Sequence, residues 1–178
     1  MVYTKTYEAP PVDRREILRY AGVRGDAPEI GALLEECLKE TEGKLTYKVC
    51  YAEFPLSFFD QVGSEGLKKH LDGCQSAVVF AATVGIGIDR LIARYGGVSP
   101  TKSLLFQAIG AERIEALCEI FNGEIGGSRF SPGYGDLPLD FQKEIFKLLD
   151  CPKRIGLTLN DSMLMSPSKS VTAIIGVK

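Results

Sequence analysis

The stretch "SAVVFAATVGIG", residues 76–87, decides the fold class. Its apolar run is unbroken from Ala77 to Ala82, and a short continuous apolar run bounded by turn residues is typical of an interior strand. Gly85 and Gly87 follow, and "IDRLIARYGG" (88–97) then has helical spacing. We therefore expect an interior strand that leads through a tight turn into a helix.

Two further regions have strand character. "KLTYKVCYAEF" (44–54) alternates apolar and polar residues with a period of two, which predicts a half-buried strand. "LTLNDSMLM" (157–165) and "SVTAIIGV" (170–177) are strand-like and are separated by "SPSK", which has a turn composition. We expect these last two runs to pair as a C-terminal hairpin.

The remaining periodic segments are helical. Apolar residues recur at helical spacing in five more segments: 12–20, 26–43, 64–71, 99–123 and 139–150. Asp13, Asp26 and Ser99 are suited to cap the first, second and fourth of them. Residues 1–11 have no such pattern, and we expect a loose N-terminal arm there.

Interspersed helices and strands predict an α+β, or mixed α/β, fold. We expect one domain over residues 1–178, with a twisted sheet, mixed or largely antiparallel, on which the helices pack. A chain of 178 residues with 45% hydrophobic residues is long enough to form a substantial core.

Charge and hydropathy exclude several classes of partner. The chain has 21 basic and 23 acidic residues and a formal charge of −2, and the basic residues are scattered, so the sequence predicts no nucleic-acid partner. No apolar run is long enough to span a bilayer, and the N-terminus lacks the apolar core of a signal peptide. We expect a cytoplasmic protein without a membrane partner.

The cysteines and the single histidine indicate neither a metal site nor a catalytic triad. The five cysteines include no C-x-x-C pair, which favours reduced and mostly buried thiols: Cys37, Cys50, Cys74, Cys118 and Cys151. His70 is the only histidine and lies in an amphipathic segment, where we expect a surface or boundary position. A hydrolase triad needs a base and an orienting acid around a nucleophile, and no such pattern is present.

The turn at Gly85 and Gly87 has two interpretations. It is a tight strand-to-helix connection, or its free backbone N–H groups hold the phosphate of a ligand at the start of the helix. The third glycine of a dinucleotide-binding G-x-G-x-x-G motif is absent, because Arg90 stands in its place. Both interpretations remain open at the level of sequence.

The segment "SRFSPGYGDLP" (128–138) separates two helical segments and is the second candidate site. Arg129 has the planar fork that binds carboxylates or phosphates. Pro132 and Gly133 favour a turn, which we expect to bring Arg129, Ser131 and Tyr134 within reach of one another. The alternative is a plain surface loop.

Within this segment, "RFSPGYGDLP" resembles the R-x-x-P-G-Y-x-x-x-P element of the activation domain of cobalamin-dependent methionine synthase. "IGLTLNDSMLMSPSKSV" (155–171) resembles a second segment of that family, in the same order along the chain. Three upstream stretches are similar to small standalone members of the group: "EILRYAGVRG", "LDGCQSAVVFAATVGIGIDR" and "AIGAERIEALCEIF". The resemblance thus covers most of the chain.

The resemblance implies a ligand and a role. In the family, the activation domain binds S-adenosylmethionine and presents its methyl group to cobalamin that has become inactive as Co(II), with an electron from a flavodoxin-type donor. Arg129 would pair with the ligand carboxylate, Ser131 and Gly133 would line the site, and Tyr134 would close it. No residue is expected to be catalytic, because such a transfer depends on positioning.

The resemblance also implies a partner. The sequence has no cobalamin, folate or homocysteine module, so we expect the chain to act on a separate cobalamin-dependent methionine synthase that lacks its own activation module and carries the cobalamin. It would be one component of a methyltransferase system. The family's domain also has an N-terminal aspartate and, beyond the S-V pair, two tyrosines that contact the ligand, and we find no counterparts here.

Three hypotheses follow. The chain is a standalone reactivation subunit that binds S-adenosylmethionine. Alternatively, it is a docking or chaperone-like partner of a corrinoid protein and does not bind that ligand. The third hypothesis is an α/β enzyme that binds a phosphorylated ligand at the turn of Gly85 and Gly87.

Overall fold

The computed structural model describes residues 1–25 and 27–178. The helices are α1 (Arg14–Tyr20), α2 (Pro28–Thr41), the 3₁₀ helix η1 (Leu56–Phe59), α3 (Glu65–His70), α4 (Gly87–Gly96), α5 (Pro100–Ile125), α6 (Phe141–Leu149) and α7 (Cys151–Ile155). The strands are β1 (Tyr3–Tyr7), β2 (Tyr47–Pro55), β3 (Ser76–Thr83), β4 (Arg129–Phe130), β5 (Thr158–Leu159), β6 (Met165–Ser166) and β7 (Ser170–Val177).

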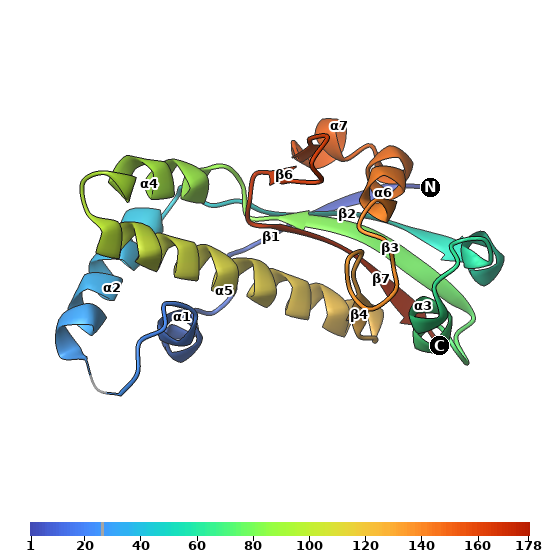
Figure 1. The fold of residues 1–178 in the computed structure, drawn as a ribbon, viewed down its shortest axis with the longest axis horizontal. Helices are drawn as coiled ribbons and strands as arrows, with labels where there is room; N and C mark the ends of the chain where they lie inside the picture. Colours follow the sequence, from blue (N-terminus) through green and yellow to red (C-terminus); the bar gives the residue numbers. More distant parts are fainter. Residues whose placement is uncertain (26) are drawn as a thin grey trace.

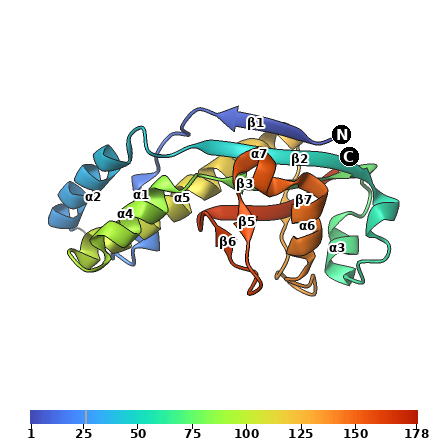
Figure 2. The same ribbon diagram turned by 90° about the horizontal axis from the view of Figure 1, so that it is seen from above.

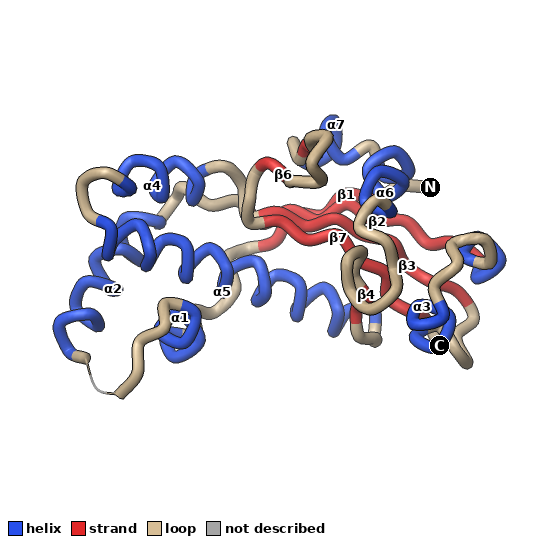
Figure 3. Tube along the Cα trace, in the orientation of Figure 1, coloured by secondary structure: helices blue, strands red, loops and turns tan. Residues whose placement is uncertain are grey.

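Five strands form one antiparallel sheet in the order β1-β2-β3-β7-β4, drawn in red in Figure 3. The predicted interior strand is confirmed: β3 lies between β2 and β7, and its residues from Ala77 to Thr83 are buried. The fold class is also confirmed, and the sheet is antiparallel rather than mixed.

Helices cover both faces of the sheet (Figures 1 and 2). On one face, α5 packs on the apolar side chains of β2, β3 and β7, including Val49, Phe80 and Ile175. On the other face, η1, α3, α6 and α7 pack on alternate residues of the same strands, including Val79 and Ile174. The period-two alternation thus sends neighbouring residues into two separate cores.

The N-terminal region differs from the expected loose arm. Residues Tyr3–Tyr7 form β1, which pairs with β2 along the register Tyr3↔Tyr51 to Tyr7↔Tyr47. Tyr3 stacks on Tyr51 with ring centroids 5.5 Å apart, and Lys5 forms an ion pair with Glu124 of α5 at 2.7 Å. All residues of β1 except Tyr7 are exposed, and a strand that buries so little has no apolar pattern that its sequence could reveal.

A buried ion pair holds the segment between β1 and α1. Arg113 of α5 is 2% exposed and donates to the carbonyl oxygens of Pro10 at 2.5 Å and Pro11 at 2.7 Å. Its counter-charge is Glu112, at 2.5 Å, which also accepts the backbone N–H of Asp13 at 3.0 Å. Asp13 caps α1 through the backbone N–H groups of residues 15 and 16, as predicted.

The C-terminal hairpin forms from different segments than expected. Within residues 157–166 the chain folds back on itself, so that β5 pairs with β6, while β7 pairs with β3 and β4. The Asn160 side chain is the local cause, because its Oδ1 accepts the backbone N–H groups of Ser162 at 3.0 Å and Leu164 at 2.9 Å. This side chain closes a turn inside what reads as one continuous strand.

The other helices lie close to their expected positions. The Ser99 side chain accepts the Lys102 N–H at 3.4 Å at the start of α5, and α5 ends at Gly126 with φ +87°, a conformation that favours glycine. The predicted cap at Asp26 lies outside the described residues. Within residues 1–25 and 27–178, no helix has the length and apolar character that crossing a membrane requires.

Replacing Arg113 with alanine should destabilise the fold strongly. The Glu112 carboxylate would stay buried without its partner, which costs about 3–5 kcal/mol of unfolding free energy. Urea denaturation measures the loss. Arg154→Ala is the control, since Arg154 is exposed on α7 and its removal should change stability by less than about 0.5 kcal/mol. Equal effects of the two substitutions would contradict a structural role for Arg113.

Candidate functional site

The short strand β4 places the candidate arginine. Arg129 pairs with Ile175 and Phe130 pairs with Ile174, and paired residues share a face of the sheet. Arg129 therefore lies on the α5 face and Phe130 on the α3 and α6 face. Gly127 permits the approach, because a Cβ there would lie 2.7 Å from Cγ2 of Ile175 and 2.8 Å from the carbonyl oxygen of Gly176.

Arg129 lines an open hollow of about 630 Å³ at the end of α5. Its side chain is 20% exposed and forms ion pairs with Glu115 and, at 3.2 Å, with Glu119. Burial raises the pKa of the nearby Cys118 thiol to about 12, so this thiol stays neutral. The counter-charges of Arg129 are therefore the two glutamates.

The loop that follows β4 is compact and carries the other candidate residues. The Gly133 N–H donates to the Leu137 carbonyl oxygen at 2.9 Å, and the Tyr134 N–H donates to that of Ser131 at 3.1 Å. Gly133 has φ +85°, a conformation that side chains disfavour. Tyr134 is 69% exposed and meets Phe130 edge-on, with centroids 5.4 Å apart. The loop thus presents Tyr134 to solvent.

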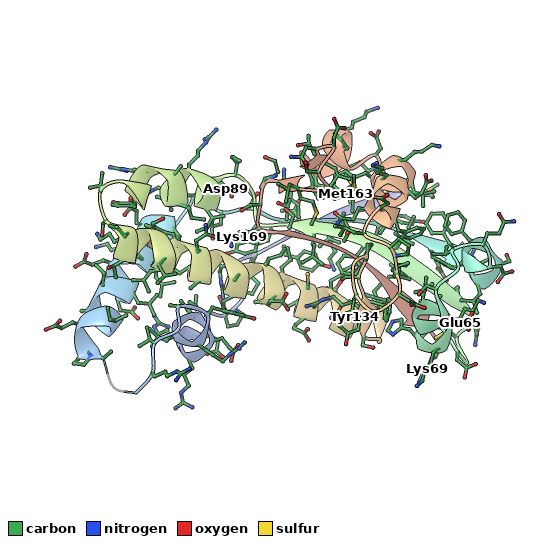
Figure 4. The ribbon with its side chains drawn as sticks, viewed as in Figure 1. Glu65, Lys69, Asp89, Tyr134, Met163 and Lys169 are labelled. Atoms are coloured by element: carbon green, nitrogen blue, oxygen red, sulfur yellow. The ribbon has the colours of Figure 1, made fainter. Side chains whose placement is uncertain are left out.

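Asp136, which sequence reasoning did not single out, holds this loop against α3. Its carboxylate accepts hydrogen bonds from the Ser64 hydroxyl at 2.5 Å, the Glu65 N–H at 2.7 Å and the Gly66 N–H at 3.1 Å. The Ser64 hydroxyl and the backbone N–H groups lower the pKa of this carboxyl. Figure 4 labels Tyr134 on the loop and Glu65 on the neighbouring helix.

The structure brings only some of the predicted residues together. Ser131, Gly133 and Tyr134 share one loop, whereas Arg129 contacts α5 and Tyr134 contacts Phe130. The expected convergence of Arg129 with Tyr134 is therefore not what the structure shows. The cause is the strand pleat, which points the consecutive residues Arg129 and Phe130 to opposite faces. Tyr134 packs on Phe130 and so lies on the face opposite Arg129. The two groups flank the edge strand of the sheet.

The turn at Gly85 and Gly87 is explained by close packing. A Cβ at Gly87 would overlap the Lys44 carbonyl oxygen, and a Cβ at Gly85 would overlap the Thr46 hydroxyl. The Thr46 N–H donates to the Val84 carbonyl oxygen at 3.0 Å, which holds the two segments together. The first turn of α4 also contains Asp89, whose carboxylate accepts the Ser168 N–H at 3.0 Å. The structure therefore favours the tight-turn interpretation.

The environments of the cysteines and of the histidine are those of structural residues. Four cysteines are buried and Cys74 is partly exposed, all as free thiols. Cys50 and Cys151 lie with their sulfur atoms 3.9 Å apart. His70 has the predicted boundary position, with its Nε2 atom 3.1 Å from the Ser128 carbonyl oxygen. Among the described residues, no cluster of histidine, cysteine and acidic side chains is suited to hold a metal ion.

Comparison with a solved structure concerns the fold. The chain shares the fold of a crystal structure of the MetH reactivation domain bound to AdoHcy, with a TM-score of 0.71 and 17% identity over 99% of this chain and 78% of that one. The resemblance to the methionine synthase activation domain is therefore confirmed at the level of the fold.

Two sequence comparisons match part of the chain to the same kind of domain. Residues 116–178 match the model for "Vitamin B12 dependent methionine synthase, activation domain", and this range includes Arg129, Ser131, Gly133 and Tyr134. Methionine synthase of Mycobacterium tuberculosis is 31% identical over 96 residues, which cover 52% of this chain and 8% of that protein. The C-terminal third of the chain is thus similar to activation-domain sequence, and the chain spans only a small part of the length of the synthase that it matches.

Gly87→Ala should destabilise the protein because the new methyl group collides with the Lys44 backbone. We expect a loss of about 1–3 kcal/mol, as for other substitutions that overfill a packed contact. Gly96→Ala in the same helix is the matched control: no atom lies within 4 Å of an added Cβ there, and alanine should raise stability by up to about 1 kcal/mol. Thermal unfolding of both variants checks this, and an unaffected Gly87→Ala would reopen the phosphate interpretation.

Proposed function

We propose that this chain binds S-adenosylmethionine at the edge of β4 and presents its methyl group for reductive methylation of cob(II)alamin on a separate cobalamin-dependent methionine synthase. The observation that carries the proposal is the position of Arg129. This residue matches the arginine of the motif that the segment resembles, lies within the matched range 116–178, and borders an open hollow at the edge strand.

The charges around Arg129 suit this ligand. S-adenosylmethionine has one carboxylate and two cationic groups, an ammonium and a sulfonium. When the ligand carboxylate pairs with Arg129, Glu115 and Glu119 are released to face the cationic groups. These two glutamates also line a second hollow of about 350 Å³, together with Asp13, Glu16 and Glu112. After the ligand carboxylate has replaced the two glutamates on Arg129, each charged group of the protein and of the ligand still has a partner of opposite charge.

The loop after β4 supplies the other contacts. Because β4 is the edge strand, a ligand that lies across this edge reaches Arg129 on one side and the backbone of Ser131 and Gly133 on the other. Tyr134 then covers the bound ligand. These groups bind and orient, which is what transfer of an activated methyl group requires of a protein. The cobalamin would be carried by the partner, the electron would come from a flavodoxin-type donor, and the system would operate in the cytoplasm.

Calorimetric titration of S-adenosylhomocysteine, a stable analogue, tests the site. We expect saturable binding that Arg129→Ala weakens roughly 10- to 150-fold, since a hydrogen bond to a charged group is worth about 1.5–3 kcal/mol. Arg129→Ala should change stability by no more than about 1 kcal/mol, because its glutamate partners are solvent-exposed.

Arg154→Ala is the matched control for this titration and should bind like the wild type, because Arg154 lies on α7, away from β4. Unchanged affinity in Arg129→Ala would contradict the site.

One observation favours the alternative of a docking partner that does not bind S-adenosylmethionine. Arg129 already has two carboxylate partners, and a ligand carboxylate must displace them. Under this alternative, the chain should bind a purified cobalamin-loaded synthase that lacks its activation module with the same affinity whether or not S-adenosylmethionine is present. Under our proposal, the methyl donor should strengthen that association. Surface-immobilised synthase and soluble chain provide the measurement.

A further inference from the structure

Helix α3 is distant in sequence from the candidate ligand segment, residues 128–138. The two are in contact at three points. The first is the carboxylate of Asp136, at the end of the loop, which accepts hydrogen bonds from the Ser64 hydroxyl, the Glu65 N–H and the Gly66 N–H. Ser64 in turn accepts the Leu67 N–H at 3.0 Å as the cap of α3. One carboxylate therefore joins the loop to the start of a helix some 70 residues earlier.

The second contact is aromatic. Phe130 lies between His70 and Tyr134, with ring centroids 5.3 Å from the first and 5.4 Å from the second. Gly66 makes room for this arrangement, because a Cβ there would lie 3.1 Å from Cζ of Phe130 and 2.8 Å from Oδ1 of Asp136. The exposed ring of Tyr134 thus packs against Phe130, which in turn packs against His70 of α3.

The third contact lies at the start of the segment. Nε2 of His70, at the end of α3, is 3.1 Å from the Ser128 carbonyl oxygen, and a ring nitrogen that faces a carbonyl oxygen acts as the donor. Both ends of α3 therefore hold the segment that contains Arg129 and Tyr134, one end through His70 and the other through Asp136.

We propose that Asp136 is a positioning residue for the ligand loop, residues 131–137, and that α3 is the element against which it positions that loop. This inference rests on the proposed function, because the ligand is the one that Arg129 binds. Asp136 acts through Tyr134 and the loop backbone, without contact to the ligand. Asp136 itself is exposed and its contacts join the loop to α3 rather than to the sheet, so they should order the loop locally and contribute little to the stability of the buried sheet.

The test combines affinity with local hydrogen exchange. Asp136→Ala should weaken S-adenosylhomocysteine binding about tenfold by releasing the loop before the ligand binds. Amide exchange should accelerate at Gly133, Tyr134 and Leu137 and stay unchanged in β3. Asp136→Asn keeps one carbonyl acceptor for Ser64 and should recover part of the affinity.

Asp140→Ala is the matched control. Asp140 is a nearby exposed aspartate whose side chain makes no capping hydrogen bond to α6, so this variant should match the wild type in both measurements. Ser64→Ala should weaken binding less in the Asp136→Ala background than in the wild type, because the contact between the two side chains is then already lost.

The outcomes separate this inference from the proposed function. Faster loop exchange with unchanged affinity in Asp136→Ala overturns the positioning role alone. Faster exchange in β3 together with the loop also overturns it, because the effect is then general destabilisation. Absence of binding by the wild type, or unchanged affinity in Arg129→Ala, contradicts the proposed site, and the positioning role falls with it.

Discussion

Two backbone pairings, Arg129 with Ile175 and Phe130 with Ile174, fix the geometry of the candidate site. They attach the β4 edge to β7 and so to the sheet, and the pleat then directs the two side chains apart. Arg129 meets the carboxylates at the end of α5, whereas Phe130 meets α3 and supports Tyr134. Without this pairing, the arginine and the loop would have no defined relation to each other.

Two arginines of the chain differ in burial, and this difference distinguishes a structural role from a binding role. Arg113 is 2% exposed and its hydrogen bonds end on the carbonyl groups of Pro10 and Pro11 and on Glu112. Arg113 therefore has a structural role. Arg129 keeps an open side, and its partner Glu119 is 70% exposed. Solvent-exposed partners exchange at little cost, which is what a binding site for a charged ligand requires.

Local patterns were sufficient to predict much of the fold. The apolar run at β3 predicts an interior strand without knowledge of its neighbours, and caps such as Ser99 mark where a helix begins. Pairing depends on distant residues, so the sequence pattern predicts a C-terminal hairpin between the wrong segments and gives no signal for β1. The turn made by Asn160 was a local signal that could have divided the run at 157–165.

The candidate site shows the same difference between local patterns and long-range contacts. Arg129 and Tyr134 are recognisable from the motif, but the pleat that separates them depends on pairing with β7. Asp136 was not singled out because its partners lie about 70 residues away. The acid within "PGYGDLP" and the serine cap of α3 are visible in the sequence, yet nothing local connects them. The part that sequence predicts is residue chemistry, and the part that it misses is long-range contact.

A backbone amide NMR titration of the chain with S-adenosylhomocysteine tests the proposed binding site at β4 directly. We expect shifts at Arg129, across residues 131–137 and at the end of α5 near Glu115 and Glu119, with the turn at Gly85 and Gly87 unaffected. Shifts confined to that turn and the start of α4, with none around β4, would contradict the proposed site.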